Sequence, residues 1–208
     1  MISLLIETIP FIFFYSFDAN TIDIFNYLIE IDILFYLMDA KPETPIEEEK
    51  EVEDTYIKVK SLFDTNNIQY KFFEHAPAKT SEEVAKIRGT PLETGAKSML
   101  IKIDKEFILI VIPANKKFNS KPAKKFLHTD CLRFAYKNEL EELTHCLQGA
   151  VPPFGSIFNI KTYADESIFT DKTYDYISFN GGMRVRSFQI KKEDYLKLEK
   201  PTLCNICK

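Results

Sequence analysis

A lysine at the start of an apolar run is the first residue of this chain whose position suggests chemistry. Lys97 lies in Gly95-Ala-Lys-Ser98, directly before a stretch rich in β-forming residues. An ammonium group carried into an apolar strand is costly unless it has a partner or a task. Lys97 is therefore either a substrate-binding cation or a solvent-facing lysine at a strand end, and its spacing alone favours the second interpretation.

Two segments rich in small residues could bind a ligand through their backbone. In Gly149-Ala-Val-Pro-Pro-Phe-Gly155, two glycines flank two prolines, which predicts a stiff loop whose N–H groups can hold a carbonyl or phosphate oxygen. In Phe179-Asn-Gly-Gly-Met183, two residues without side chains follow Asn180 and let a ligand approach the backbone closely. Taken singly, the first segment is more typical of a rigid connector, and the Asn-Gly pair is a strong hairpin signal.

Short strands and scattered helices must position these segments. The helix after Thr80 begins with a Ser/Thr-x-x-Glu capping box, and Gly89 marks its end. Further helices are expected near 56–63, 121–127, 139–146 (capped by Asn138) and 191–198, and strands near 68–74, 97–104, 107–113, 132–135, 157–163, 176–179 and 185–190. Because helices and strands do not alternate regularly, the pattern predicts a mixed α/β (α+β) single domain around a strongly curved sheet. It argues against a doubly wound nucleotide-binding fold, and no glycine-rich phosphate loop of either standard kind is present.

Charge is distributed unevenly along the 208 residues. The net charge is −4, but residues 1–54 hold 13 of the 31 acidic residues and only two of the 27 basic ones, Lys41 and Lys50. Residues 55–208 therefore carry 25 basic and 18 acidic residues, a balance of +7. A basic folded part suits a polyanionic ligand bound through its phosphates, although this balance is also ordinary for a soluble domain.

The N-terminal segment differs from the rest of the chain. Two apolar runs, 2–17 and 22–38, are interrupted by acidic residues, so neither is a clean membrane span of ~20 apolar residues. No Lys or Arg precedes Lys41 to form the basic region of a signal peptide. We therefore expect no membrane association. The abrupt change of composition at Met38 favours this residue as the natural start, with 1–37 absent from the native protein.

We expect three parts along the chain. Residues 1–54 form an apolar and then acidic extension and linker, 55–203 the folded domain and 204–208 a C-terminal tail. The tail contains a Cys-x-x-Cys pair, Cys204 and Cys207. Zinc would need two more ligands with paired spacing, which the remaining Cys and His residues lack, so we expect no metal site. Reduced thiols are typical of a cytosolic protein.

The order and spacing of the motifs identify a family resemblance that no single motif carries. The motifs are, in order, His75-Ala-Pro, Thr80-Ser-Glu-Glu-Val-Ala, Arg88-Gly-Thr, Gly95-Ala-Lys-Ser, Ile112-Pro-Ala, Gly149-Ala-Val-Pro-Pro-Phe-Gly, Asp165-Glu-Ser-Ile and Phe179-Asn-Gly-Gly. Together they resemble the YbaK/EbsC family, the editing domains associated with prolyl-tRNA synthetase, over about residues 55–203.

This resemblance implies a cytoplasmic trans-editing aminoacyl-tRNA deacylase. Such an enzyme hydrolyses the ester between a wrong amino acid and the 3′ end of tRNA, here a small residue such as Ser, Thr, Ala or Cys. The implied fold is a barrel-like mixed sheet with flanking helices. The implied reaction uses a bound water and needs no cofactor, metal or covalent nucleophile. The partners are mischarged tRNA and, as a further candidate, an aminoacyl-tRNA synthetase.

The resemblance also assigns roles by position. Lys97 matches the family lysine that activity requires, and Gly149 and Ala150 match the loop that faces the scissile carbonyl, so these three are the expected catalytic residues. The expected substrate-binding residues are Asn180, Gly181, Gly182, Pro152, Pro153, His75 and Thr80. His75 is expected at the pocket rim, with a general base as the alternative. Some relatives have Gly at the position of Ala150 and Ser at that of Asn180, so the preferred amino acid stays open.

Basic residues provide candidate contacts to the tRNA acceptor stem. They are Lys116, Lys117, Lys121, Lys124, Lys125, Arg184 and Arg186. Such contacts would set affinity and salt dependence rather than specificity. A solvated basic helix face is the alternative for Lys121–Lys125. For the whole domain, the alternatives are an inactive tRNA-binding or synthetase-docking module and, last, a hydrolase of another small ester or amide.

Overall fold

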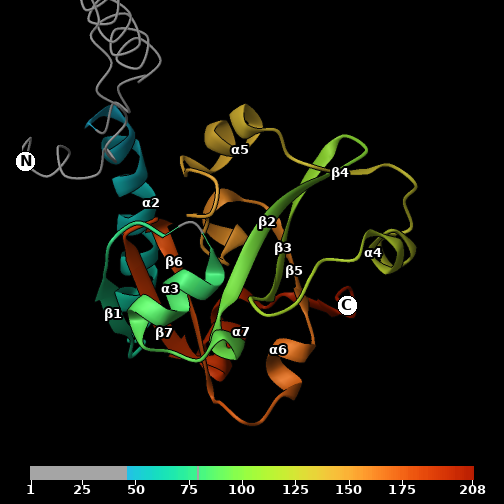
Figure 1. Ribbon diagram of the computed structural model, residues 1–208. Helices are drawn as coiled ribbons and strands as arrows, with labels where there is room; N and C mark the ends of the chain where they lie inside the picture. The colour runs from blue at the N-terminus through green and yellow to red at the C-terminus, as the bar shows by residue number, and fades with distance from the viewer. Residues whose placement is uncertain (1–45, 79) are drawn as a thin grey trace, which may run out of the picture. The chain divides into compact units, whose positions relative to one another are not determined.

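The computed structural model describes residues 46–78 and 80–208 (Figure 1). The helices, including two 3-10 turns labelled η, are α2 Ile46–Thr65, α3 Ser81–Arg88, η1 Leu92–Thr94, α4 Ser120–Leu127, α5 Lys137–Thr144, η2 Gly155–Phe158, α6 Ser167–Thr170 and α7 Lys192–Glu199. The strands are β1 Lys71–Glu74, β2 Ala96–Ile103, β3 Glu106–Pro113, β4 Leu132–Phe134, β5 Lys161–Asp165, β6 Tyr176–Met183, β7 Arg186–Lys191 and β8 Thr202–Cys204. The hypotheses about residues 1–37 and about the linker up to residue 45 lie outside the described residues.

Helix α2 begins at Ile46, before the domain boundary expected at residue 55. Residues 46–54 consist largely of Glu, a good helix former, so this acidic run is helical rather than a linker. The helix lies beside strand β6 (Figure 1). Within the described residues, no helix combines the length and the apolar character that a membrane span requires.

The hairpin β2–β3 is the centre of a five-stranded sheet with the order β4-β2-β3-β5-β8. β4 pairs antiparallel with β2, whereas β5 and β8 join in parallel. The predicted hairpin is confirmed, and its turn uses Asp104 with a φ of 50°, a conformation that Asp tolerates well. The register places Lys97 opposite Ile112, so the lysine is a paired residue of this largely apolar hairpin.

A three-stranded antiparallel sheet, β1-β7-β6, completes the strands. A parallel bridge between Gly95 and Ser178 connects it to the start of β2. A Cβ atom on Gly95 would lie 2.6 Å from the Cβ of Ala114, so a side chain would prevent this close approach. The described strands thus form two connected sheets rather than a closed barrel. The predicted mixed α/β fold with flanking helices is confirmed.

Aromatic side chains fill the main core. The ring of Phe63 on α2 lies 5.6, 6.4 and 5.3 Å from the rings of Phe154, Phe179 and Phe188. All four residues are buried, and burying one such side chain contributes ~1.5–3 kcal/mol to folding. The hydroxyl of the buried Tyr195 donates a hydrogen bond to the carbonyl of Pro153 at 2.9 Å. The core therefore fixes the proline-containing loop relative to β6 and α7.

The C-terminal residues are folded into a second apolar cluster. Ile206 is buried with residues of β3 and α4, and its N–H donates to the Asp165 carboxylate at 2.9 Å. Cys207 forms a β-bridge with Phe118. Residues 204–208 are therefore part of the fold, not the expected tail. Strand β8 has only three residues, too few for a sequence pattern to reveal it.

Three local predictions differ from the structure. The hairpin turn after β6 lies at Arg184 and Val185, because the sequence Asn180-Gly-Gly forms a β-bulge within β6. Helix α5 has Tyr136, not Asn138, as its N-terminal cap, and the Glu139 carboxylate accepts the Tyr136 N–H at 2.9 Å. The run expected as a strand over 157–163 divides into the turn η2 and strand β5.

Candidate active site

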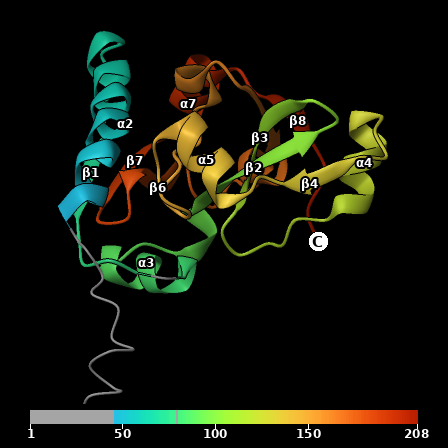
Figure 2. The same ribbon diagram turned by 90° about the horizontal axis from the view of Figure 1, so that it is seen from above.

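The three segments that the sequence singles out meet at one cavity of about 470 Å³. The start of β2 contributes residues 96–99, and the first turns of α3 contribute Ser81 and Val84. The other walls come from Gly149 with its neighbours and from Asn180 on β6. Helix α3 lies close to the N-terminal end of β2 in both views of the fold (Figures 1 and 2). Segments far apart in sequence therefore border one cavity.

Lys97 is held at this cavity by the β2–β3 hairpin. Its ammonium group donates a hydrogen bond to the carbonyl of Ala114 at 3.0 Å, and the Ala114 N–H donates to the carbonyl of Gly95 at 2.7 Å. Burial lowers the pKa of Lys97, while the nearby charge of Glu82 opposes that shift. An ammonium group has three N–H donors, so Lys97 can bind ligand oxygens in addition to Ala114.

The loop after α5 presents Gly149 and Val151 to the cavity. Gly149 has a φ of +89°, and a tight turn brings the Ala150 N–H to the carbonyl of Leu147 at 2.9 Å. The Ala150 carbonyl accepts the N–H of Gly182 at 3.0 Å, which ties the loop to the bulge in β6. Both polar backbone groups of Ala150 are therefore used within the protein. The prolines, Pro152 and Pro153, are buried and are not among the residues that line the cavity.

A chain of hydrogen bonds orients Asn180. Its side-chain N–H donates to the carbonyl of Gly149 at 2.7 Å, and its Oδ1 accepts the hydroxyl of Ser187 at 3.0 Å. Nε2 of His75 lies 2.7 Å from the same hydroxyl oxygen, and Nδ1 lies 2.9 Å from the carbonyl of Ala76. His75 thus supports Asn180 through Ser187 instead of lining the cavity. The sequence motifs did not include Ser187, a buried residue of β7 that only the strand register brings here.

The two glycines after Asn180 are required by packing. A Cβ on Gly181 would lie 2.4 Å from the ring of Phe188, and one on Gly182 would lie 2.9 Å from Thr55 on α2. Gly182 also has a φ of +98°, which favours glycine. Both residues are buried, so their missing side chains let α2 and β7 approach β6, which positions Asn180.

Thr80 lies at the cavity as the N-terminal cap of α3. Its hydroxyl accepts the N–H of Glu83 at 3.2 Å, which confirms the predicted start of the helix, and Gly89 ends it with a φ of 65°. The N-terminal end of a helix carries a partial positive charge. Together with Lys97 and the cavity-lining Arg184, this helix end makes the site suitable for an anionic or oxygen-rich ligand.

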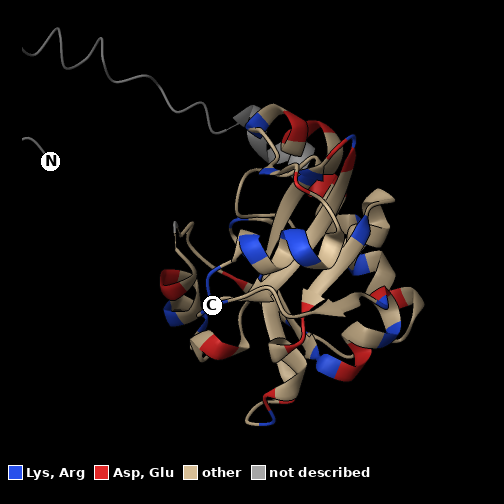
Figure 3. Ribbon diagram, turned by 90° about the vertical axis from the view of Figure 1, so that its right-hand side faces the viewer, with Lys and Arg blue, Asp and Glu red and all other residues tan. Residues whose placement is uncertain are grey.

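The candidate tRNA-binding cations lie on different surfaces. Lys121, Lys124 and Lys125 are on α4, which faces the viewer in Figure 3. Arg184 reaches the cavity. Arg186 instead pairs with Glu53 at 3.8 Å and Glu74 at 3.5 Å, and it stacks 4.7 Å from the centre of the Tyr56 ring. Arg186 is therefore engaged with residues of α2 and β1.

The possible metal ligands do not gather at one place in the described part of the chain. No three His, Cys, Asp or Glu side chains converge there as a metal-binding group. Cys204 is buried and Cys207 half-buried, and burial raises the pKa of each thiol to about 12. Both groups are therefore protonated at neutral pH.

Known proteins resemble this chain in sequence and in fold. The Multifunctional Ser/Thr-tRNA deacylase ProXp-y of Escherichia coli (strain K12) is 29% identical over 155 residues, which cover 73% of this chain and 92% of the relative. Proline--tRNA ligase of Bacillus licheniformis is 34% identical over 95 residues, 45% of this chain and 17% of that enzyme. A crystal structure described as a candidate trans-editing enzyme for prolyl tRNA synthetase superimposes with a TM-score of 0.66. It is 22% identical and covers 74% of this chain and 97% of its own.

The match to a family model covers the residues that build the cavity. The model of the aminoacyl-tRNA editing domain matches residues 75–198, from the histidine before α3 to the end of α7. This range contains Lys97, the Gly149 loop, Asn180 and Ser187. The chain belongs to the aminoacyl-tRNA editing domain family.

Proposed function

We propose that this protein hydrolyses the ester bond of mischarged aminoacyl-tRNA and so removes a small amino acid such as Ser, Thr, Ala or Cys. One observation carries the proposal: Lys97, the Gly149 loop and Asn180 border a single cavity within an aminoacyl-tRNA editing domain. The Ser/Thr-tRNA deacylase named above supports the choice of small hydroxyl-bearing residues. The proposed place of action is the cytoplasm.

The proposed reaction relies on positioning and on electrostatic stabilisation. Water adds to the ester carbonyl carbon, the bond to the ribose oxygen breaks, and that oxygen takes a proton. Free amino acid and tRNA are the products. Lys97 is proposed to hold substrate oxygens near the terminal adenosine. Its hydrogen bond to the Ala114 carbonyl fixes the ammonium group and uses one of the three N–H donors. A bound ester is readily hydrolysed when water and donors are preorganised around it.

The Gly149 loop is proposed to face the scissile carbonyl. Because the Ala150 N–H already donates to Leu147, the proposal gives the donor role to the N–H of Gly149 and to Lys97, with Ala150 fixing the loop. Asn180 holds the Gly149 carbonyl and so fixes the peptide between Gly149 and Ala150, which adjoins the peptide that carries the Gly149 N–H. A water molecule oriented by the ribose hydroxyl of tRNA completes the arrangement.

Single-turnover deacylation tests the proposal directly. Transfer RNAs charged with Ser, Thr, Ala, Cys and Pro are mixed with excess protein, and the remaining ester is measured over time. We expect fast release from one or two of the mischarged species and loss of that release in Lys97→Ala. Lys105→Ala, which removes an exposed lysine from the β2–β3 turn, is the matched control and should act like wild type. Binding without release from any member would contradict the enzyme and support a tRNA-binding module.

A further inference from the structure

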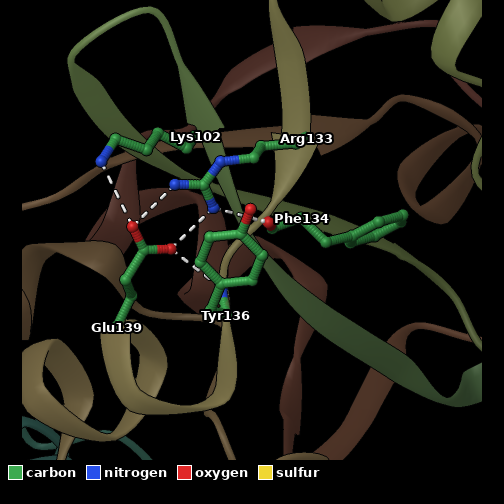
Figure 4. A network of polar contacts seen from close by, with 5 residues as sticks. All are labelled: Lys102, Arg133, Phe134, Tyr136 and Glu139. Carbon is green, nitrogen blue, oxygen red and sulfur yellow. Dashed lines mark hydrogen bonds and ion pairs between the residues drawn. The ribbon is translucent and has the colours of Figure 1, made fainter.

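An exposed aromatic ring lies flat on an arginine beside β4. The side chain of Tyr136 covers the guanidinium group of Arg133, whose central carbon is 4.1 Å from the ring centre (Figure 4). Tyr136 is 62% exposed, although most tyrosines bury much of their ring. The neighbouring Phe134 is 55% exposed and points away from this pair. Tyr136 also occupies a helix N-cap, where Ser, Thr, Asp or Asn are usual.

Glu139 holds the Tyr136–Arg133 pair in a fixed position. Its two carboxylate oxygens accept separate hydrogen bonds from Arg133, each of 2.7 Å. The same carboxylate accepts the Tyr136 N–H at 2.9 Å and the ammonium group of Lys102 at 3.2 Å (Figure 4). A ring backed by a clamped guanidinium loses little conformational freedom when a flat ligand stacks on it. The pair is therefore preorganised, with two cations around one anion.

Strand β4, which precedes Tyr136, pairs with the strand whose first half lines the cavity. Phe134 is opposite Ile101, and the Ala135 N–H donates to the carbonyl of Leu100 at 2.9 Å. Tyr136 follows Ala135 in the chain, and Met99, the neighbour of Leu100 in β2, lines the cavity. Two residues of strand, about 7 Å, separate Met99 from Lys97. Stacked nucleotides follow one another at ~3.4 Å per strand, so a nucleic-acid strand that runs this far along β2 advances by up to two nucleotides.

We propose that Tyr136, backed by Arg133, is a stacking platform for a base of the single-stranded 3′ end of tRNA, one or two nucleotides before the terminal adenosine. The platform rests on the proposed function, because the cavity holds the terminal nucleotide. Aromatic rings and guanidinium planes stack on unpaired bases without sequence preference. This binding mode suits an end shared by different tRNAs. Arg133 and Lys102 add positive charge beside the backbone of the strand.

The first test separates the platform from the cavity by using two substrates. One is mischarged tRNA, and the other is the same amino acid esterified to adenosine alone, which lacks the preceding nucleotides. Tyr136→Ala should raise KM for the tRNA about tenfold and leave hydrolysis of the adenosine ester unchanged. Tyr136→Phe keeps the ring and should stay within about twofold of wild type on both substrates. Ile57→Ala, at another exposed apolar residue, is the control.

A second test requires no hydrolysis. Uncharged tRNA carries 2-aminopurine at the position before the terminal adenosine, or at the one before that, and stacking on Tyr136 should quench its fluorescence. The quenching should persist in Tyr136→Phe and disappear in Tyr136→Ala. If Tyr136→Ala kept both the fluorescence quenching and the KM for tRNA of wild type, the proposed platform would be refuted. An equal loss on both ester substrates would also overturn it, in favour of a role in cavity shape. Failure of wild type to release any amino acid would instead refute the proposed function, while the quenching experiment would still decide the platform.

Discussion

The hydroxyl of Ser187 joins two residues that the motifs place far apart, Asn180 and His75. Through Asn180 the chain continues to the carbonyl of Gly149, so a buried residue of β7 helps to orient the loop at the cavity. Every link in this chain is 3.0 Å or shorter. At the scale of single residues, the site therefore depends on supporting contacts as much as on groups that face the ligand.

Asn180→Asp tests this support with almost no change of shape. The substitution replaces the N–H that faces Gly149 by an oxygen, so two acceptors would meet at a distance that now holds a 2.7 Å hydrogen bond. We expect the loop to shift and the single-turnover rate to fall roughly tenfold or more, since small misplacements cost large factors in rate.

Asn138→Asp on the exposed face of α5 is the matched control for that experiment. It should keep the wild-type rate, and both variants should keep the wild-type circular dichroism spectrum. An unchanged rate in Asn180→Asp would show that the Gly149 carbonyl needs no donor.

At the scale of elements, the bulge in β6 sets the position of the site. Gly181 and Gly182 let β6 approach Phe188 and α2, and the N–H of Gly182 holds the Ala150 carbonyl. The sequence Asn-Gly-Gly is a turn signal, yet here it bends a strand. Helix α5 similarly uses the carboxylate of Glu139 as a shared acceptor for its own N-terminus and for Arg133.

Gly182→Ala should destabilise the fold more than Gly149→Ala does. Both residues have positive φ, but a Cβ on Gly182 would lie 2.9 Å from both Thr55 and the N atom of Tyr56, whereas a Cβ on Gly149 meets nothing within 4 Å. We expect a loss of about 2–4 kcal/mol for Gly182→Ala and about 1 kcal/mol for Gly149→Ala in urea unfolding. Equal losses would mean that α2 yields easily to the added methyl group.

Glu139→Gln should make stability less sensitive to acid. Hydrogen bonds from Arg133 and from the Tyr136 N–H lower the pKa of Glu139 to about 2. A carboxyl group whose pKa is lower in the folded than in the unfolded protein stabilises the fold at pH values above 4.5, its ordinary pKa. This contribution disappears as the pH falls toward 2. The Tm of wild type should exceed that of Glu139→Gln at pH 7, and the difference should shrink through this range. A difference independent of pH would contradict the assignment. Glu142→Gln, an exposed residue of the same helix, is the control.

At the scale of the whole molecule, positive charge lies over α4 while the cavity opens beside α3 and β2. Lys121, Lys124 and Lys125 share the eight-residue helix α4 (Figure 3). The tRNA acceptor stem is a polyanion, so this helix could contact its backbone while the 3′ end enters the cavity. Such contacts would contribute affinity that depends on salt rather than sequence.

Replacing these three lysines by Gln should reduce the salt dependence of tRNA binding. Each lost phosphate contact makes the negative slope of log K against the logarithm of the salt concentration less steep by about 0.7–0.9. Lys58→Gln on α2 is a control at an exposed lysine on another helix. Binding measured by fluorescence anisotropy at several salt concentrations gives the slope. The same slope in the triple variant would show that α4 is only a solvated basic face. Tyr136→Ala, in contrast, should weaken binding and leave the slope unchanged.

Signals confined to a few neighbouring residues determined much of this protein from its sequence. Thr80 and Gly89 marked the ends of α3, and the alternating β-rich runs on either side of residues 105–106 predicted the β2–β3 hairpin. Capping, turns and periodicity depend on contacts within about one turn of helix or one strand pair, so the sequence displays them directly. The ordered motifs alone indicate the family to which residues 75–198 match.

Only the tertiary structure decided which residues share the site. Ser187 reaches Asn180 because β6 and β7 pair in one register, and Arg133 lies opposite Lys102 because β4 pairs with β2. The pairing of β1 with β7 brings Arg186 to Glu74, and the packing of α2 brings it to Glu53. Strand register and packing act between residues that are distant along the chain, and a shift of one residue would turn every side chain to the opposite face. For that reason the motifs indicate where the site lies, while the tertiary structure determines which residues contact and support it.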